Sequence, residues 1–342
     1  MGSALSTRDD RQDSPAGGAS RPTQTLSADA AGITRAADLI RAGGLVAFPT
    51  ETVYGLGADA TSAAAVAGIY AAKERPRFNP LIAHLPTLQA AEREGVFDEY
   101  ARSLAQAFWP GPLTLVVPVS ASGTVCDLAR AGLDSVALRV PDHVLAREVL
   151  AQTGRPVAAP SANPSGRVSP TSAAHVLADM TGRVDAVLDG GETAVGVEST
   201  IVACLGGVPR LLRPGGLARE AIEAVLGRSL AAAHGEAAAP RAPGMLASHY
   251  APAARVRLNA TTIAPGEAAL LFGPEDLPGV SEARAVRNLS PSGDLPEAAA
   301  NLFAYLRALD ASGAPVIAVA PIPETGLGEA IADRLSRAAA DR

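Results

Sequence analysis

The stretch "TSAAAVAGIYAAKERPRFNPLIAHL", residues 61–85, indicates the fold class because it joins a helical pattern to a strand pattern through a polar loop. Residues 61–74 start with Thr and Ser, as many helices do. Residues 81–85 form a short apolar run of the kind found in buried strands. The loop between them is rich in arginine and proline, and it follows Lys73, the single lysine of the chain.

The same alternation extends on both sides of this stretch, over residues 28–227. Strands are predicted at 45–48, 81–85, 113–119, 135–140, 156–160, 185–189, 199–205 and 209–213. Helices are predicted at 33–44, 61–74, 98–109, 143–154, 171–182 and 217–227. Alternating strands and helices indicate an α/β fold, and the adjacent strands near residue 200 favour a mixed sheet.

A second, smaller unit follows a break in the pattern. Residues 228–254 are rich in Ala and Pro and have no sustained period, which predicts a linker. Residues 255–342 again alternate and predict a second α/β unit. Its strands are predicted at 256–260, 268–273, 283–289 and 315–322, and its helices at 295–312 and 326–340.

Composition narrows the class of protein. With 342 residues, 48% of them hydrophobic, the chain is long enough for two domains. No apolar run approaches the roughly 20 residues needed to cross a bilayer. Residues 1–27 are polar and lack the apolar centre of a signal peptide, so we expect a disordered leader on a cytoplasmic protein. A net charge of −6 argues against a surface that binds nucleic acid broadly.

Several familiar signatures are missing or out of context. "GLGADA", residues 55–60, fits a dinucleotide-binding pattern but does not lie in the turn directly after a strand. The chain has no G-x-x-x-x-G-K-[ST] sequence, which excludes a P-loop. The two cysteines are best explained as small buried apolar residues, and the five histidines lack the spacing of zinc ligands. The sequence therefore predicts no metal ion held by protein ligands.

Polar residues gather in loops bounded by Pro and Gly at the predicted ends of strands, where α/β proteins place ligand sites. Lys73 and Arg75 offer a point charge and a planar fork for phosphate oxygens. Arg213 offers a second fork, or else a surface ion pair. Ser161 and Asn163 suit a phosphate or a sugar, or else cap their own turn. Any one loop alone is better explained as a solvated turn, but together the loops favour a ligand site.

Eight ordered segments together resemble the Sua5 branch of the YrdC/Sua5 family, the threonylcarbamoyl-AMP synthases. The segments are "GGLVAFPTETVYGLGADA", "KERPRFNPLIAHL", "FWPGPLTLVV", "VALRVPDH", "APSANPSGRVSPT", "GVESTIV", "LLRPG" and "PGM" followed by "HYAP". The resemblance begins near residue 30 and continues to the C-terminus. It implies a YrdC-like twisted mixed sheet with helices around a ligand cavity at 28–227, a linker or lid at 228–254, and a Rossmann-like α/β Sua5 domain at 255–342.

The resemblance also implies an activity and a site. The enzyme would make L-threonylcarbamoyladenylate and pyrophosphate from L-threonine, bicarbonate or CO2, and ATP with Mg²⁺. Downstream tRNA threonylcarbamoyl-transferase machinery would use the product to modify adenosine 37 of tRNAs reading ANN codons; tRNA itself is a further candidate partner, and no membrane is expected. By motif, threonine is expected against Thr52, His84, Arg139, Ser161 and Ser199. ATP is expected against Lys73, Arg75, Asn79, Ser135, Asn163, Thr171, Arg213 and either His249 or Tyr250, with Lys73 and Arg75 catalytic.

The residue types suit this chemistry, but two alternatives are weighed against it. A carbamate attacks the α-phosphorus without a protein nucleophile, so the reaction depends on positioning and charge neutralisation. A protein that only binds RNA is expected to have a broad basic surface, and the net charge of −6 argues against one. An enzyme that uses carbamoyl phosphate to modify a hydrogenase-maturation partner would carry zinc-finger segments, which two cysteines exclude.

Overall fold

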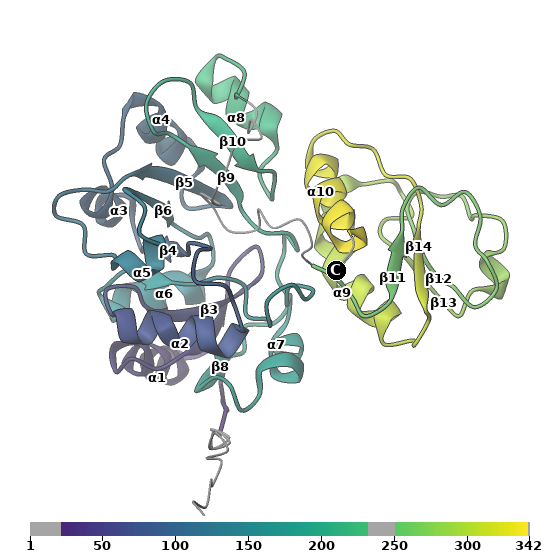
Figure 1. Ribbon diagram of the computed structural model, residues 1–342, viewed down its shortest axis with the longest axis horizontal. Helices are drawn as coiled ribbons and strands as arrows, with labels where there is room; N and C mark the ends of the chain where they lie inside the picture. The colour runs from purple at the N-terminus through teal and green to yellow at the C-terminus, as the bar shows by residue number, and fades with distance from the viewer. Residues whose placement is uncertain (1–21, 232–249, 341–342) are drawn as a thin grey trace, which may run out of the picture.

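The computed structural model describes residues 22–231 and 250–340 and contains two α/β units (Figure 1). The first unit is built on a ten-stranded mixed sheet in the order β1-β8-β2-β3-β7-β4-β6-β5-β9-β10. Its strands are β1 Gln24–Leu26, β2 Val46–Pro49, β3 Tyr54–Asp59, β4 Ile82–His84, β5 Leu113–Pro118, β6 Ser135–Arg139, β7 Val157–Ala158, β8 Ala186–Leu188, β9 Thr200–Ala203 and β10 Arg210–Arg213. The predicted α/β class with a mixed sheet is therefore confirmed.

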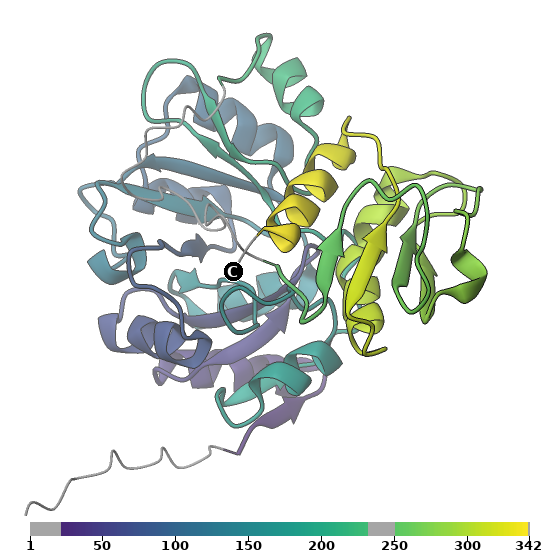
Figure 2. The same cartoon turned by 45° about the vertical axis from the view of Figure 1, so that its right-hand side comes forward.

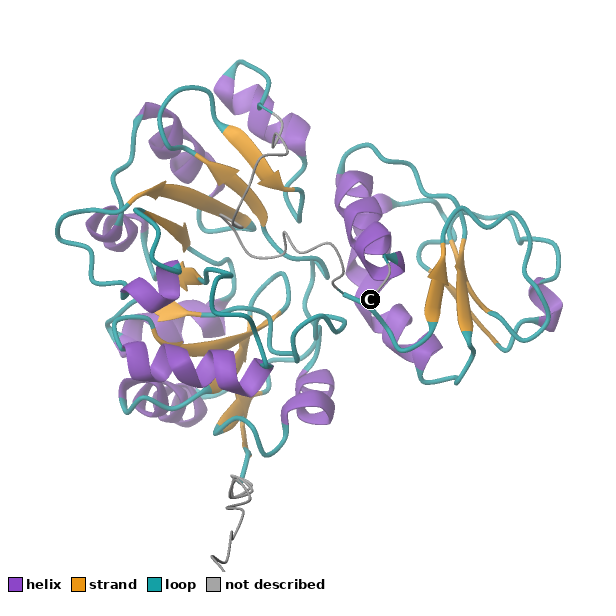
Figure 3. Cartoon of the chain, in the orientation of Figure 1, coloured by secondary structure: helices purple, strands orange, loops and turns teal. Residues whose placement is uncertain are grey.

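Eight helices surround this sheet in the described part of the first unit (Figure 3). They are α1 Ala30–Arg41, α2 Ala63–Lys73, α3 Leu88–Glu94, α4 Glu99–Phe108, α5 Asp127–Arg130, α6 Val144–Thr153, α7 Ala173–Met180 and α8 Arg219–Leu226. Side-chain oxygens cap the N-termini of five of them; for example, Asp29 accepts a hydrogen bond from the Gly32 amide, and Ser62 accepts one from the Ala65 amide. These caps satisfy amides that have no partner within the helix.

The helix α2 ends where the sequence places the only lysine. Glu74, which follows Lys73, has a φ of 53°, a left-handed conformation that terminates the helix. The loop that follows enters β4, whose residues Ile82 and His84 pair with Ala137 and Arg139 of the parallel strand β6. The other neighbour of β4 is the antiparallel strand β7, whose Val157 is opposite His84. Both α2 and β4 agree with the elements predicted from residues 61–85.

The second unit has a four-stranded, fully parallel sheet in the order β11-β14-β12-β13. It comprises β11 Arg255–Arg257, β12 Ala268–Leu271, the short 3₁₀ helix η1 Val280–Glu282, β13 Ala285–Asn288, α9 Leu295–Asp310, β14 Val316–Val319 and α10 Leu327–Ala339. In two views, α9 and α10 lie between this sheet and the first unit (Figures 1 and 2). The predicted smaller C-terminal α/β unit is confirmed.

The structure corrects the predicted leader at its C-terminal end. Residues 1–27 were expected to be disordered, but Gln24–Leu26 form β1 and pair in parallel with Ala186–Leu188 of β8. Residues 1–21 lie outside the described residues. A strand of three residues surrounded by polar sequence has too short a pattern to be recognised before its partner is known.

Buried apolar clusters hold each unit together and continue across their boundary. The largest cluster lies wholly in the first unit and extends from Leu45 to Leu230. The core of the second unit takes in Val53, Val168 and Val197 from the first unit. Within residues 22–231 and 250–340, no helix is long and apolar enough to cross a bilayer.

Candidate active site

A polar cavity lies in the first unit, beside the end of β4. Its empty volume is about 470 Å³ including the open mouth. The wall includes seven residues that the motifs had indicated, which are Arg75, His84, Arg139, Ser161, Ser199, Arg213 and Tyr250. Val53, Ile82, Ala159, Pro160 and the acidic Glu198 supply the rest of the wall. Segments separated by more than a hundred residues therefore meet in one hollow.

The residues expected to hold threonine gather around Arg139. Arg139 is the last residue of β6 and the register partner of His84 on β4. Its Nη2 donates to the hydroxyl of Thr52 at 2.9 Å and forms an ion pair with Glu51 at 2.7 Å. Thr52 does not line the cavity itself but orients the guanidinium that does. The Nε of Arg139 is buried without a hydrogen-bond partner among the described residues, which leaves a donor for a ligand.

His84 is neutral in this environment. The side chain is buried, and Nδ1 lies 3.2 Å from the carbonyl oxygen of Ile82. Burial, with the neighbouring Arg139 charge as the second cause, lowers the pKa of His84 to about 3. At neutral pH the imidazole therefore offers one donor and one acceptor but no charge. Arg139, the register partner of His84, is therefore the neighbouring cation that can neutralise an anion at this end of the cavity.

Two further arginines place positive charge in the same cavity. Arg213 donates from Nε and Nη2 to the Ser199 carbonyl at 3.2 and 2.8 Å, and Nη2 lies 3.3 Å from the Ser199 hydroxyl. Arg75 donates from Nη2 to the Pro80 carbonyl at 3.2 Å. Burial lowers the pKa of Arg213, and it brings that of Arg75 to about 10, which leaves Arg75 protonated near neutral pH.

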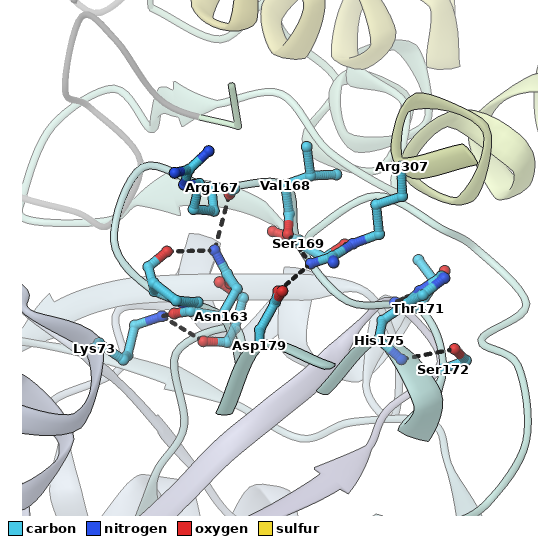
Figure 4. A network of polar contacts seen from close by, with 12 residues as sticks. Lys73, Asn163, Arg167, Val168, Ser169, Thr171, Ser172, His175, Asp179 and Arg307 are labelled. Carbon is cyan, nitrogen blue, oxygen red and sulfur yellow. Dashed lines mark hydrogen bonds and ion pairs between the residues drawn. The ribbon is translucent and has the colours of Figure 1, made fainter. Parts of the chain in front are cut away.

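Lys73 and Asn163 belong to one network of polar contacts (Figure 4). Neither residue lines the cavity, but Ser161, whose carbonyl Lys73 binds, does. Lys73 Nζ donates to the main-chain carbonyls of Ser161, at 2.6 Å, and of Asn163. Asn163 Nδ2 donates to the carbonyls of Pro164 and Arg167 at 2.9 and 2.8 Å. Burial, followed by the repulsion of Arg75, lowers the pKa of Lys73 well below its usual value. The lysine thus binds α2 to the loop that carries Ser161.

The structure brings Asn79 to the same region and leaves two other predicted residues outside it. Both side-chain atoms of Asn79 are buried without partners in the described part of the chain, so this amide is available to a ligand. Ser135 begins β6 and lines a separate hollow with Leu133 and Leu205. The Thr171 hydroxyl lies 3.3 Å from His175 Nδ1, away from the cavity wall.

The predicted linker contributes one cavity residue that can be described. Tyr250 is 1% exposed and lies in the cavity wall. Its ring stacks on Phe303 of α9 with centroids 5.6 Å apart. His249, the alternative candidate from this segment, lies outside the described residues, as does the rest of 232–249.

Sequence reasoning missed two acidic residues of the site. Glu198 lies in the cavity wall, accepts a hydrogen bond from the Ser169 hydroxyl at 2.5 Å and pairs with Arg334 of the second unit at 2.8 Å. Burial would raise the pKa of Glu198, but the charges of Arg334 and Arg213 outweigh it and lower the pKa. Glu51 pairs with Arg139. Glu198 directly precedes Ser199, and Glu51 directly precedes Thr52. Their position inside the motifs was therefore the one sequence feature that could have indicated these two acidic residues.

Comparison with protein-family models matches both units. The model described as "Telomere recombination", which covers Sua5, YciO and YrdC proteins, matches residues 38–215. The model described as the C-terminal domain of threonylcarbamoyl-AMP synthase matches residues 217–340. The boundary between the two models, near residue 216, comes before α8, whereas the sequence pattern placed the end of the first unit at residue 227.

Similar proteins extend over nearly the whole chain. A curated threonylcarbamoyl-AMP synthase of Bacillus subtilis is 41% identical over 337 residues, covering 94% of this chain and 96% of that protein. One from Pyrococcus abyssi is 43% identical over 90% of this chain and 94% of that protein. The crystal structure of P. abyssi Sua5 complexed with L-threonine has a TM-score of 0.83 at 39% identity and covers 93% of this chain and 97% of that one. E. coli YciO, at 20% identity with a TM-score of 0.51 over 57% of this chain and 96% of that one, shares the fold. The chain therefore belongs to the Sua5 branch of the YrdC/Sua5 family of enzymes, the threonylcarbamoyl-AMP synthases.

Proposed function

We propose that this enzyme makes L-threonylcarbamoyladenylate and pyrophosphate from L-threonine, bicarbonate or CO2, and ATP. The observation that carries the proposal is that a single cavity joins two arginines, Arg75 and Arg213, to a second polar region formed by His84, Arg139 and Ser161. The first region suits phosphate oxygens and the second a small zwitterion. A Sua5 protein with this fold has been crystallised with L-threonine, which supports the amino-acid half of the assignment.

The reaction can proceed through substrate groups alone. The amine of threonine adds to CO2 and loses a proton, which gives a carbamate. A carbamate oxygen then forms a bond to the α-phosphorus of ATP, and the bond from that phosphorus to the pyrophosphate oxygen breaks. The protein must align the two groups and neutralise the charge on the departing pyrophosphate. We propose that Arg75 and Arg213, in the cavity wall, provide this neutralisation and that Arg139, held by Thr52 and Glu51, binds the threonine carboxylate.

Mg²⁺ belongs to the substrate in this proposal. Among residues 22–231 and 250–340, no three His, Cys, Asp or Glu side chains are grouped so that they could hold a metal ion. Mg²⁺ usually keeps several waters and binds through phosphates and one or two carboxylates. We therefore propose that it enters bound to ATP and leaves with pyrophosphate.

The product fixes the biological context of the proposal. A carbamoyl adenylate is a mixed anhydride, so another enzyme must consume it soon after release. We propose that downstream tRNA threonylcarbamoyl-transferase machinery uses it to modify adenosine 37 of tRNAs reading ANN codons. We propose that the enzyme works in the cytoplasm, the location expected from the sequence.

A single assay tests the reaction. The full chain is incubated with L-threonine, bicarbonate, Mg-ATP and pyrophosphatase, and the adenylate is sought by mass spectrometry. We expect a product that contains ¹³C when ¹³C-bicarbonate is used and that disappears when threonine is omitted. Tight tRNA binding without adenylate would favour the RNA-binding alternative. Adenylate formed only with carbamoyl phosphate would favour the other alternative.

A further inference from the structure

The second unit directs one fully buried arginine toward the cavity. The side chain of Arg334, on α10, has no exposed surface. Its Nε donates to Glu198 Oε2 at 2.8 Å, and its Nη1 donates to the carbonyl of Pro214 at 2.9 Å. Glu198 lines the cavity, and Pro214 directly follows Arg213, which also lines it. A residue from the C-terminal unit therefore contacts both segments that carry the Arg213 end of the cavity.

Arg334 also contacts Tyr250, the described cavity residue of the linker. Its Cζ lies 5.2 Å from the centroid of the Tyr250 ring, and the ring stacks on Phe303. Tyr250 has a φ of 62°, in the left-handed region that a tyrosine rarely adopts. Such a conformation persists only where the surroundings hold it. Arg334 and Phe303, both from the second unit, provide that support.

Stability alone explains this arrangement poorly. Removing charges from water costs so much that well-packed apolar residues can often replace a buried ion pair without loss of stability. Arg334 Nη2 adds to the cost because it is buried and has no hydrogen-bond partner among the described residues. The contacts of Arg334 add little to stability, but they hold Glu198 and Tyr250 in position. Holding these two cavity residues in position is the better explanation for a buried arginine here.

We propose that Arg334 is a positioning residue of the synthase reaction, which fixes Glu198 and Tyr250 in the cavity wall and so makes the site depend on the C-terminal unit. This inference rests on the function proposed above. Glu198 immediately precedes Ser199, whose carbonyl and hydroxyl lie within hydrogen-bond distance of Arg213. A shift of Glu198 therefore displaces Ser199 and the Arg213 guanidinium together. Because these groups act on the transition state, their displacement lowers kcat.

The first experiment compares full-length Arg334→Met and Arg334→Lys with the wild type. We expect kcat to fall at least about tenfold in Arg334→Met, and lysine to restore it only in part because it cannot reproduce the guanidinium fork. Arg219→Met is the matched control. It removes an ion pair between α8 and Glu329 of the same helix α10, away from the cavity. The control should keep kcat within about twofold of the wild type.

The pH profile separates positioning from loss of stability. Arg334 is the first of the charges that lower the pKa of Glu198, so Arg334→Met raises that pKa. The rate of the variant should therefore begin to fall at a higher pH than the wild-type rate as the solution is acidified. A lower Tm with unchanged kcat and an unchanged pH profile would show a purely structural role and overturn the inference.

A double variant covers the case in which Arg334→Met fails to fold. Glu198→Gln together with Arg334→Met removes the carboxylate that Arg334→Met alone would leave buried without Arg334. Asp333, the other carboxylate paired with Arg334, keeps its ion pair with Arg337. If Arg334 acts through Glu198, the double variant is no slower than Glu198→Gln alone. A further fall in kcat of about tenfold on adding Arg334→Met to Glu198→Gln would overturn the inference. A wild-type enzyme that makes no adenylate would overturn the proposed function itself, whereas an active wild type with a fully active Arg334→Met would overturn only the inference.

Discussion

At the scale of single residues, the lysine that the composition marks as exceptional proves to hold two segments together. Lys73 ends α2, and its amine binds the carbonyls of Ser161 and Asn163, which lie about ninety residues further along the chain. The sequence could indicate that the position was special because every other basic residue except histidine is arginine. The sequence could not predict the two carbonyl partners. Every residue has a main-chain carbonyl, so residue types do not show which carbonyls accept a hydrogen bond.

The geometry at Lys73 predicts that arginine cannot replace it. The amine is fully buried against two carbonyl oxygens, a space suited to a compact ammonium and not to a planar fork. We expect Lys73→Ala to abolish pyrophosphate release and Lys73→Arg to remain at least about tenfold below the wild type. Arg183→Lys, at an exposed ion pair with Glu74, is the control for a general effect of exchanging these residues. Full activity in Lys73→Arg would contradict the geometric argument.

The low pKa of His84 predicts a particular dependence of stability on pH. The folded protein holds this imidazole neutral down to about pH 3, whereas the unfolded chain protonates it near pH 6.5. Between these values the unfolded state binds the extra proton, so stability falls as the pH is lowered. The contribution of His84 to this slope is up to about 1.4 kcal/mol per pH unit. Urea unfolding between pH 4.5 and 7 should therefore show a shallower slope for His84→Gln, and equal slopes would contradict the assignment.

At the scale of elements, the sequence predicted those with a clear period and missed those defined by their partners. The helices α2, α6 and α7 were found because a polar residue precedes each pattern. The strand β3 was missed because Gly55 and Gly57 match a nucleotide-binding pattern and because glycine is uncommon inside strands. Their role is packing: a Cβ on Gly57 would lie 2.6 Å from Phe48 of β2. The short helices α3 and α5 have too few residues for periodicity to distinguish them from loops.

One loop between elements controls the approach of two cavity segments. A Cβ built on Gly215 would lie 2.3 Å from the carbonyl oxygen of Glu198 and 2.4 Å from the carbonyl carbon of Ser199. We expect Gly215→Ala to push these backbones apart, with a loss of about 1–3 kcal/mol in the free energy of unfolding. The value of kcat/KM for adenylate formation should fall at least about tenfold.

Gly68→Ala is the matched control for that substitution. Gly68 lies within α2, where a new Cβ would make only ordinary contact, at 3.4 Å, with Leu45. Alanine there should stabilise the protein by about 0.5–1 kcal/mol, because it removes the entropic cost of a helical glycine, and should leave kcat/KM unchanged. Equal behaviour of the two variants in assays and thermal melts would show that the close approach at Gly215 does not matter.

At the scale of the whole molecule, ion pairs join the two units, and no sequence pattern predicted them. Arg307 of α9 binds Asp179 of α7 at 2.6 Å and also the carbonyl of Val168 (Figure 4). Arg334 of α10, in the second unit, forms an ion pair with Glu198 of the first unit. Each arginine lies more than a hundred residues from its partner, and a surface arginine would look the same in the sequence. Domain organisation was thus predictable from pattern breaks, whereas the interface was not.

These contacts predict the result of removing the second unit. The cut belongs after Ala231, because Leu230 is part of the main core and Ala231 forms a bridge to Arg210. The remaining clusters of the first unit are complete, so the shortened chain should fold, with a native-like circular dichroism spectrum. It should nevertheless lack Tyr250 in the cavity wall and the Arg334 partner of Glu198. We expect kcat/KM for adenylate to fall at least about tenfold, or ATP to be consumed without adenylate, because the wall no longer excludes water. A shortened chain that makes and retains the adenylate as well as the full chain would show that the second unit is only attached to the site and does not help to form it.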